Sequence, residues 1–187
     1  MFIQTEQTPN PETLKFIPGK VISPIEPLEF NSDAEAEYAP IAQRLFVING
    51  VKTVFLGSDF ITITKQADEI WANLKPAVIS AIMDHFMANM PVLLENAEAS
   101  LDEEEFFEEG DKDLVLAIKD LIDTRIRPAV AQDGGDIVFK GFKEGIVYLR
   151  MKGACAGCPS STMTLKSGIE NLLRHFIPEV VSVEQSV

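Results

Sequence analysis

An acidic run divides this chain of 187 residues into two parts of different charge. Residues 96–110 (NAEASLDEEEFFEEG) contain seven acidic residues and no basic one. Residues 1–95 contain 12 acidic and 6 basic residues, a net charge of −6, whereas residues 111–187 contain 10 of each and are neutral. Because a run of like charges repels itself, it is typical of a solvated linker. We therefore predict domains at 1–92 and 111–187, joined by an acidic linker at 93–110.

Two aromatic residues, Phe106 and Phe107, interrupt the acidic run. They either pack the linker onto one of the domains or form a docking motif for a basic partner. We favour packing, because a charged run is most often solvated surface.

The overall charge and hydrophobicity exclude several kinds of partner. A net charge of −13 disfavours binding to a nucleic acid or to an anionic membrane surface. The longest apolar stretch, residues 77–94, is broken by Asp84, His85 and Pro91, whereas a membrane span needs about 20 mostly apolar residues. We therefore expect neither a nucleic-acid partner nor a membrane partner.

The only two cysteines, Cys155 and Cys158, form a C-x-x-C pair in a loop of small residues (GACAGCP). This arrangement argues against a secreted disulfide framework and for a reducing compartment. Pro159 follows at once and suits the first position of a helix, so we expect Cys158 at a helix N-terminus. The backbone N–H groups and helix dipole there favour thiolates and the anions that thiolates bind.

Two thiolates are half of the four ligands that a [4Fe–4S] cluster or a structural zinc ion takes. The chain therefore carries half a site, and a second copy, a partner or a small thiol must supply the rest. The glycines and alanines leave room for a cluster or a second backbone to approach the sulfurs.

Residues 1–90 have the pattern of an α+β unit. The predicted strands are 2–6, 13–17, 51–56 and 60–65, and the predicted helices run from Ser32 or Asp33 to Ile48 and from about Pro76 to Met90. The second helix has an apolar stripe, which we interpret as a core face rather than a groove: Ile79, Ile82, Met83, Phe86 and Met90. We expect His85, beside this stripe, at the surface or at a helix cap. The unit has no nucleophile motif and no glycine-rich phosphate loop.

Residues 111–187 have the pattern of a second two-layer α+β unit. We predict a helix at 113–126, strands at 137–140 and 146–151, a helix after Pro159, and a strand at 180–183. The buried stripe of the second helix is predicted to contain Leu165, Ile169, Leu172, Leu173 and Phe176. Residues 133–136 (DGGD) are interpreted as a structural turn, and Arg127, Lys152 and His175 as surface or packing residues. The fold class is therefore α+β, with two small two-layer α/β-sandwich-like domains.

Several motifs resemble a known family. Arg127-Pro128, residues 133–137 (DGGDI), 153–161 (GACAGCPSS), 164–170 (TLKSGIE) and 178–180 (PEV) resemble the C-terminal domain of NifU. Residues 8–16 (TPNPETLKF) resemble the separate N-terminal domain of Nfu-type proteins. Together the two resemblances cover nearly the whole chain.

The resemblance implies an iron–sulfur cluster scaffold or carrier and not an enzyme. It implies a homodimer that forms on cluster binding, with one [4Fe–4S] cluster bridging two subunits through Cys155 and Cys158 of each. The partners it implies are an upstream iron–sulfur assembly scaffold and apo iron–sulfur client enzymes. No segment resembles the IscU-like assembly domain of larger NifU proteins, so we expect carriage rather than assembly.

Two alternative functions fit the C-x-x-C spacing. A thiol–disulfide redox protein also places this motif after a strand and before a helix, although it normally has a preceding βαβ unit. A zinc-bridged structural dimer uses the same four thiolates, so ligand count does not separate zinc from a cluster. For location, the N-terminal residues have neither signal-peptide nor transit-peptide character, so we expect a bacterial cytoplasmic protein, with a mature mitochondrial matrix form as the alternative.

Overall fold

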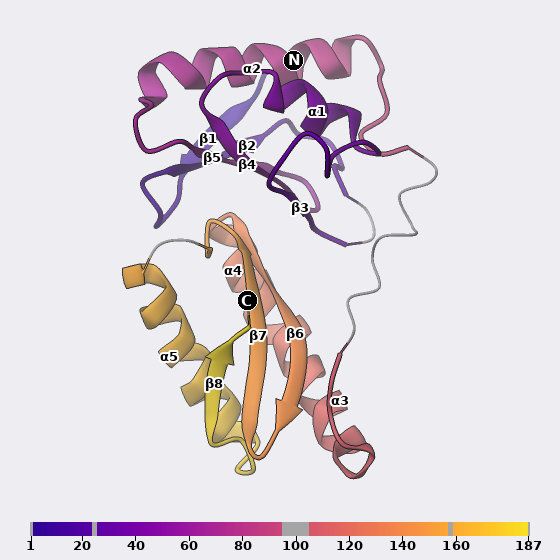
Figure 1. Ribbon diagram of the computed structural model, residues 1–187, viewed down its shortest axis with the longest axis vertical. Coiled ribbons are helices and arrows are strands. Elements are labelled where there is room, and N and C mark those ends of the chain that lie inside the picture. The colour runs from indigo at the N-terminus through magenta and orange to yellow at the C-terminus, as the bar shows by residue number, and fades with distance from the viewer. Residues whose placement is uncertain (1, 24–25, 95–104, 157–158, 187) are drawn as a thin grey trace. The chain divides into compact units, whose positions relative to one another are not determined.

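The computed structural model of the protein describes residues 2–23, 26–94, 105–156 and 159–186. The chain separates into two compact units, residues 1–101 and 102–187 (Figure 1). Much of the predicted linker lies outside the described residues, so the predicted boundaries at 92/93 and 110/111 stay predictions. Among the described residues, no helix is long and apolar enough to cross a membrane.

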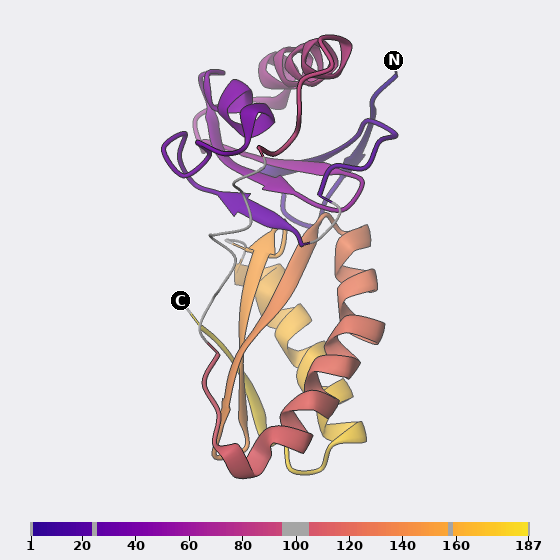
Figure 2. The same ribbon diagram turned by 90° about the vertical axis from the view of Figure 1, so that its right-hand side faces the viewer.

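The first unit is an antiparallel sheet covered on one face by two helices (Figure 2). Its strands are β1 (Gln4–Gln7), β2 (Thr13–Ile17), β3 (Leu28–Phe30), β4 (Val51–Leu56) and β5 (Ile61–Lys65), in the spatial order β1-β2-β5-β4-β3. The helices are α1 (Pro40–Phe46) and α2 (Trp71–Met87). Alternate residues of the strands point toward these helices and form the core with them, which is the two-layer arrangement expected from the sequence.

Helix positions in this unit differ from those predicted. The helix α1 begins at Pro40 instead of near Ser32, because Pro40 takes the first turn while residues 33–38 form turns before it. The helix α2 begins five residues before Pro76, which lies inside it. The short strand β3 was not predicted, because three residues are too few to show an alternating pattern.

His85 is not a surface or capping residue, as the sequence suggested, but is fully buried. It shares the buried face of α2 with Leu74, Val78 and Ile82, whereas Ile79 lies at the edge of that face. Burial and the nearby positive charge of Arg44 both lower the pKa of His85 below its ordinary value of 6.5. A polar ring on an otherwise apolar face is therefore held in its neutral form.

The second unit is a three-stranded sheet with all of its helices on one face (Figure 2). Its strands are β6 (Gly135–Lys143), β7 (Ile146–Gly153) and β8 (Ser182–Gln185), in the order β6-β7-β8. The hairpin β6–β7 is antiparallel and β8 pairs parallel to β7. The helical segments are η2 (Glu109–Asp111), α3 (Lys112–Leu121), η3 (Ile122–Ile126), α4 (Arg127–Gln132) and α5 (Pro159–Phe176).

The first helix of this unit does not end at Ile126, as predicted, but continues to Gln132. A proline inside a helix lacks an N–H donor and crowds the preceding turn. Here a π-helical turn, η3, comes directly before Arg127 and Pro128 and widens the helix at that point. In α5, Ile169 and Leu173 are buried as predicted, but Phe176 is 49% exposed and lies beside the guanidinium of Arg125, 5.5 Å from the ring centroid.

The predicted packing of the acidic run is confirmed for Phe106. Its N–H donates to the carbonyl of Lys140 (3.0 Å), and its carbonyl accepts from the N–H of Phe142 (2.9 Å). The Phe106 ring lies over Gly141, where a Cβ would stand 2.5 Å from ring carbons, and 5.1 Å from the Tyr148 ring. The end of the acidic run is therefore attached to the sheet of the second unit.

The buried histidine predicts how the stability of the first unit depends on pH. Because the folded-state pKa of His85 is below 6.5, the unfolded chain binds more protons between these two pKa values. The free energy of unfolding should therefore be highest above pH 6.5 and should fall as the pH drops below it. Urea denaturation from about pH 7.5 to pH 5.5, the range around the ordinary histidine pKa, measures this slope.

The chain offers a matched control, since its only other histidine is the exposed His175. His85→Leu should flatten the slope between these pH values, whereas His175→Leu should leave it unchanged. An unchanged slope in His85→Leu would show that other groups cause the pH dependence.

Candidate functional site

Cys155 lies in the turn that follows β7, four residues before α5 begins at Pro159. The start of α5 at Pro159 confirms the helix start predicted from the sequence. Cys158 lies outside the described residues, so its ligand role and its place at a helix N-terminus stay predictions. The end of β7, the turn between α4 and β6, and the start of α5 lie at the same end of the second unit (Figure 1).

The backbone of the Cys155 turn is held by a hydrogen bond on either side of the cysteine. The N–H of Ala154 donates to the carbonyl of Gly134 (3.1 Å), which belongs to the turn before β6. The hydroxyl of Thr162 donates to the carbonyl of Cys155 (3.2 Å) from the first turns of α5. These bonds connect the cysteine to the strand before it, the helix after it and the turn between α4 and β6.

The DGGD turn is more than a local turn, because it forms the wall against which Cys155 packs. Gly134 has φ +83°, a conformation that glycine adopts without strain. Gly135 pairs with Gly153 across the β6–β7 hairpin. A Cβ on Gly135 would stand 2.6 Å from the Cys155 Sγ and 2.7 Å from the Lys152 carbonyl oxygen. The sequence favoured a purely structural turn here over a role in shaping the cysteine loop, whereas the structure brings the turn into contact with Cys155.

Arg127 is not simply solvated, as the sequence suggested, but binds Asp136 through two hydrogen bonds. Its Nε donates to Oδ1 of Asp136 (2.9 Å) and its Nη2 donates to Oδ2 (2.8 Å), while Nη1 pairs with Asp123 (3.1 Å). The Asp136 side chain is only 5% exposed, so its charge needs this partner. Hydrogen bonding to Asp136 also raises the pKa of Arg127 further above its ordinary value. The pair ties the start of α4 to Asp136, the last residue of the DGGD turn and the second residue of β6.

The Cys155 sulfur is buried and protonated rather than exposed as a thiolate. The residue is 6% exposed and belongs to the core of the second unit. Burial, followed by the negative charges of Asp133 and Asp136, raises the pKa of the thiol from 9.0 to about 12. Cys155 lies before the helix and beside two carboxylates, so the helix start does not favour its thiolate; the residue predicted at the helix N-terminus is Cys158.

Potential ligands do not gather around Cys155 within the described part of the chain. There, no three side chains of the types His, Cys, Asp and Glu lie close enough together to hold a metal ion. His85 belongs to the first unit, and His175 is exposed on α5 with its ring 4.9 Å from that of Phe176. Further ligands for Cys155 must come from Cys158 or from outside the described residues.

The contact between Gly135 and Cys155 predicts a steric effect of substitution. Gly135→Ala should lower the free energy of unfolding of the second unit by ~1–3 kcal/mol, because the methyl group meets the sulfur and a backbone carbonyl. Gly168→Ala is the matched control. Gly168 lies inside α5 with open space where its Cβ would stand, so alanine should stabilise the unit by ~0.5–1 kcal/mol. Chemical denaturation of both variants measures the difference, and equal effects would contradict the packed contact.

The buried thiol predicts slow alkylation. A pKa of about 12 in place of 9.0 lowers the thiolate fraction of Cys155 at neutral pH by about 1000-fold. In a Cys158→Ala variant, which carries Cys155 alone, we expect iodoacetamide to react at least about 100-fold more slowly in the folded protein than in guanidinium chloride. Intact mass measured over time gives both rates, and similar rates would show that the sulfur is accessible.

Comparison with known proteins identifies relatives of both units. A family model described as "Scaffold protein Nfu/NifU N terminal" matches residues 3–89, and one described as "NifU-like domain" matches residues 118–184. The human protein named "NFU1 iron-sulfur cluster scaffold homolog, mitochondrial" is 50% identical over 186 residues, covering 99% of this chain and 72% of its own length. Proteins of the same name from Drosophila sechellia and Drosophila virilis are also 50% identical over 99% of this chain. The chain spans 65% and 61% of their lengths.

Two solved structures have a partial likeness to the chain. The solution structure of a NifU-like protein from Saccharomyces cerevisiae gives a TM-score of 0.47 at 24% identity, over 51% of this chain and 87% of that one. The crystal structure of protein SAV1430 from Staphylococcus aureus gives a TM-score of 0.40 at 23% identity, over 44% of this chain and 99% of that one. The relationship is carried by the sequences. Since half of its residues are identical to those of the human scaffold homologue over nearly its whole length, the chain belongs to the Nfu family of iron–sulfur cluster scaffold proteins.

Proposed function

We propose that the chain carries one [4Fe–4S] cluster, held between the C-x-x-C loops of two copies, and passes it to apo iron–sulfur enzymes. The observation that carries the proposal is the half-site: Cys155 and Cys158 are the only cysteines of a chain that belongs to a cluster scaffold family. A [4Fe–4S] cluster takes four thiolates, so two chains complete its ligand set.

The surroundings of Cys155 hold the backbone of its turn in one place. The Arg127–Asp136 pair and the hydrogen bond from Ala154 to Gly134 fix the turn behind the cysteine. The residues next to Cys155 are alanines, so two such loops can approach each other without a bulky side chain between them. A turn that is fixed by these contacts and flanked by small residues suits a site that forms between two subunits.

The raised pKa of Cys155 supports release as well as binding. For Cys155 to become a cluster ligand, its sulfur must lose a proton and leave its contact with Gly135. When the sulfur dissociates from the cluster, it binds a proton again and returns to its buried position against Gly135. Burial and the charges of Asp133 and Asp136 stabilise the protonated thiol, which lowers the affinity of Cys155 for the cluster. A lowered affinity suits a carrier, which must release its cluster to another protein.

The alternatives predicted from the motif differ from the proposal in testable ways. A thiol–disulfide redox protein needs an attacking thiolate with a lowered pKa, and Cys155 has the opposite shift. A zinc-bridged dimer would use the same sulfurs but would be colourless and free of sulfide.

The names of the relatives favour a mitochondrial location for this chain. All three relatives described above are named mitochondrial. We propose that the chain works in the mitochondrial matrix in a mature form, in preference to a bacterial cytoplasm.

The proposal predicts the metal content and mass of the loaded protein. Anaerobic reconstitution with iron and sulfide should give a brown dimer with about four iron and four sulfide per two chains. Cys155→Ser should remove the visible absorption and the dimer while the circular dichroism spectrum stays unchanged. Ser167→Ala, a substitution of an exposed residue of α5 outside the C-x-x-C loop, should load like the unaltered chain.

Native mass spectrometry with iron, sulfide and zinc analysis on the same sample decides between the functions. A loaded monomer without a bound small thiol would contradict a site shared by two chains. Colourless protein that retains zinc would support the structural dimer. Full cluster retention by Cys155→Ser would exclude this cysteine as a ligand.

A further inference from the structure

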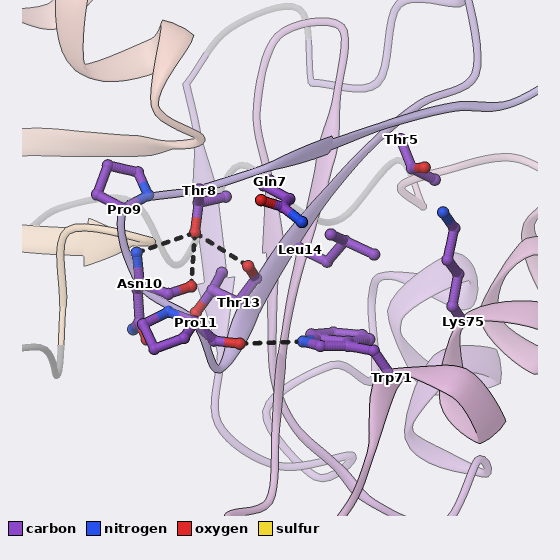
Figure 3. A pocket seen from close by; sticks show the side chains of 10 residues that line it. All are labelled: Thr5, Gln7, Thr8, Pro9, Asn10, Pro11, Thr13, Leu14, Trp71 and Lys75. Atoms are coloured by element: carbon purple, nitrogen blue, oxygen red, sulfur yellow. Dashed lines mark hydrogen bonds between the residues drawn. The ribbon is translucent and has the colours of Figure 1, made fainter.

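A pocket of about 500 Å³ lies in the first unit, where β1 and the β1–β2 loop meet the first turns of α2 (Figure 3). Its walls include Thr5 and Gln7 of β1, residues 8–11 of the loop, and Trp71 and Lys75 of α2. A volume of ~300–1,000 Å³ is usual for sites that bind small molecules or side chains. Both cysteines belong to the other unit, so the proposed cluster binding does not explain what this pocket does.

The loop wall of the pocket is fixed by its own hydrogen bonds. The Thr8 hydroxyl lies 2.8 Å from the carbonyl oxygen of Asn10 and 2.9 Å from that of Thr13, and accepts from the N–H of Asn10 (3.2 Å). The buried Asn10 side chain accepts from the N–H of Glu12 (3.0 Å). Pro9 and Pro11 restrict the backbone further. A wall that is already ordered loses little entropy when a ligand binds.

The helix wall places an aromatic ring and a cation side by side. The Trp71 indole Nε1 donates to the carbonyl of Pro11 (3.1 Å), which holds the ring against the loop (Figure 3). Lys75 follows four residues later on α2, so the two side chains lie on the same face of the helix. Leu14 adds an apolar surface from β2. One part of the pocket is therefore apolar and the adjacent part is positively charged.

Lys75 supplies a charge that the pocket does not balance. It is the only charged residue among those lining the pocket, although residues 1–95 carry a net charge of −6. It is half-buried, and no ion pair or hydrogen bond joins it to a residue that the structure describes. A carboxylate entering the pocket would meet a positive charge and no competing acid.

The position of β1 indicates that the occupant is an extended chain. In the order β1-β2-β5-β4-β3, β1 has a neighbouring strand on one side only. An edge strand can accept an added strand through main-chain hydrogen bonds. Side chains at positions i and i+2 of such a segment point the same way, about 6.7 Å apart. Residues four apart on a helix are spaced by about 5–6 Å, close to this repeat.

We propose that this pocket docks an extended, acidic peptide segment of a partner protein. A carboxylate side chain of the segment pairs with Lys75, and an apolar side chain two positions along packs on Trp71 and Leu14. The site lies in the first unit and uses neither cysteine, so it is independent of the proposed cluster site and gives that unit a recognition role.

The single tryptophan of the chain, Trp71, makes its fluorescence a specific reporter of this pocket. The probe is the capped peptide acetyl-Thr-Val-Glu-Thr-Leu-Thr-amide, titrated into the full chain, with the same peptide carrying Gln in place of Glu as its control. We expect saturable changes in Trp71 fluorescence and in the NMR signal of its indole N–H with the Glu peptide. The Gln peptide should bind about fivefold more weakly, the size of one partly exposed ion pair.

Matched variants show whether peptide binding depends on Lys75 in the pocket or on charge elsewhere on the chain. Lys75→Gln should weaken binding of the Glu peptide by about fivefold and remove the difference between the two peptides. Lys52→Gln, an exposed lysine of β4 outside the pocket, should leave both affinities unchanged. Cys155→Ser should also leave them unchanged, whatever it does to cluster loading, so the two proposals fail separately. Circular dichroism checks that each variant is folded.

Three results would overturn the proposal. The first is the absence of a saturable change in Trp71 fluorescence with either peptide. That result would show that the pocket does not admit an extended peptide. The second is equal binding of both peptides to the unaltered chain, which would remove Lys75 from recognition. The third is an equal response to sodium acetate at the same concentration, which would assign the pocket to small carboxylates and not to a peptide.

Discussion

The ion pair between Arg127 and Asp136 is the interaction on which the arrangement around Cys155 depends. A carboxylate that is almost completely buried is costly without a positive partner, and Arg127 supplies two hydrogen bonds in a planar fork. Because Arg127 opens α4 and Asp136 is the last residue of the DGGD turn, the pair ties that turn to the start of the helix before it. That turn accepts the hydrogen bond from Ala154 and leaves, at Gly135, the space that the Cys155 sulfur fills.

The two units differ in charge and in the feature that each contributes to the two proposals. The second unit is electrically neutral by sequence and contains a buried sulfur in a fixed turn of small residues. The first unit is acidic but contains a pocket with an unbalanced lysine beside a tryptophan. Under the two proposals, the second unit holds the cluster and the first unit recognises a partner protein, so each site can change without altering the other.

Sequence patterns located elements well where the pattern is local. The strand at 13–17 and the strand at 51–56 follow from apolar and β-branched residues, and Pro159 marks the start of α5. Sequence patterns failed to predict burial and helix ends where these depend on contacts or turns that leave no local pattern. The helical period places His85 on the same face as Val78 and Ile82, but its polarity gave no reason to expect burial. The predicted helix end at Ile126 was wrong because a π-helical turn before Arg127 allows the helix to pass Pro128. Phe106 was correctly interpreted as packing, but Gly141, the residue it covers, lies 35 positions away in sequence.

The sequence by itself determined the division of the chain by charge, the α+β class, and the presence of a C-x-x-C pair in a loop of small residues. These follow from composition and spacing, which act along the chain. Only the tertiary structure decided that Cys155 is buried and protonated, because its pKa depends on the carboxylates of Asp133 and Asp136, about 20 residues earlier in the chain, and on the solvent excluded around it. The pocket beside Trp71 has the same origin: the β1–β2 loop and α2 are 60 positions apart in sequence, and folding alone brings them together.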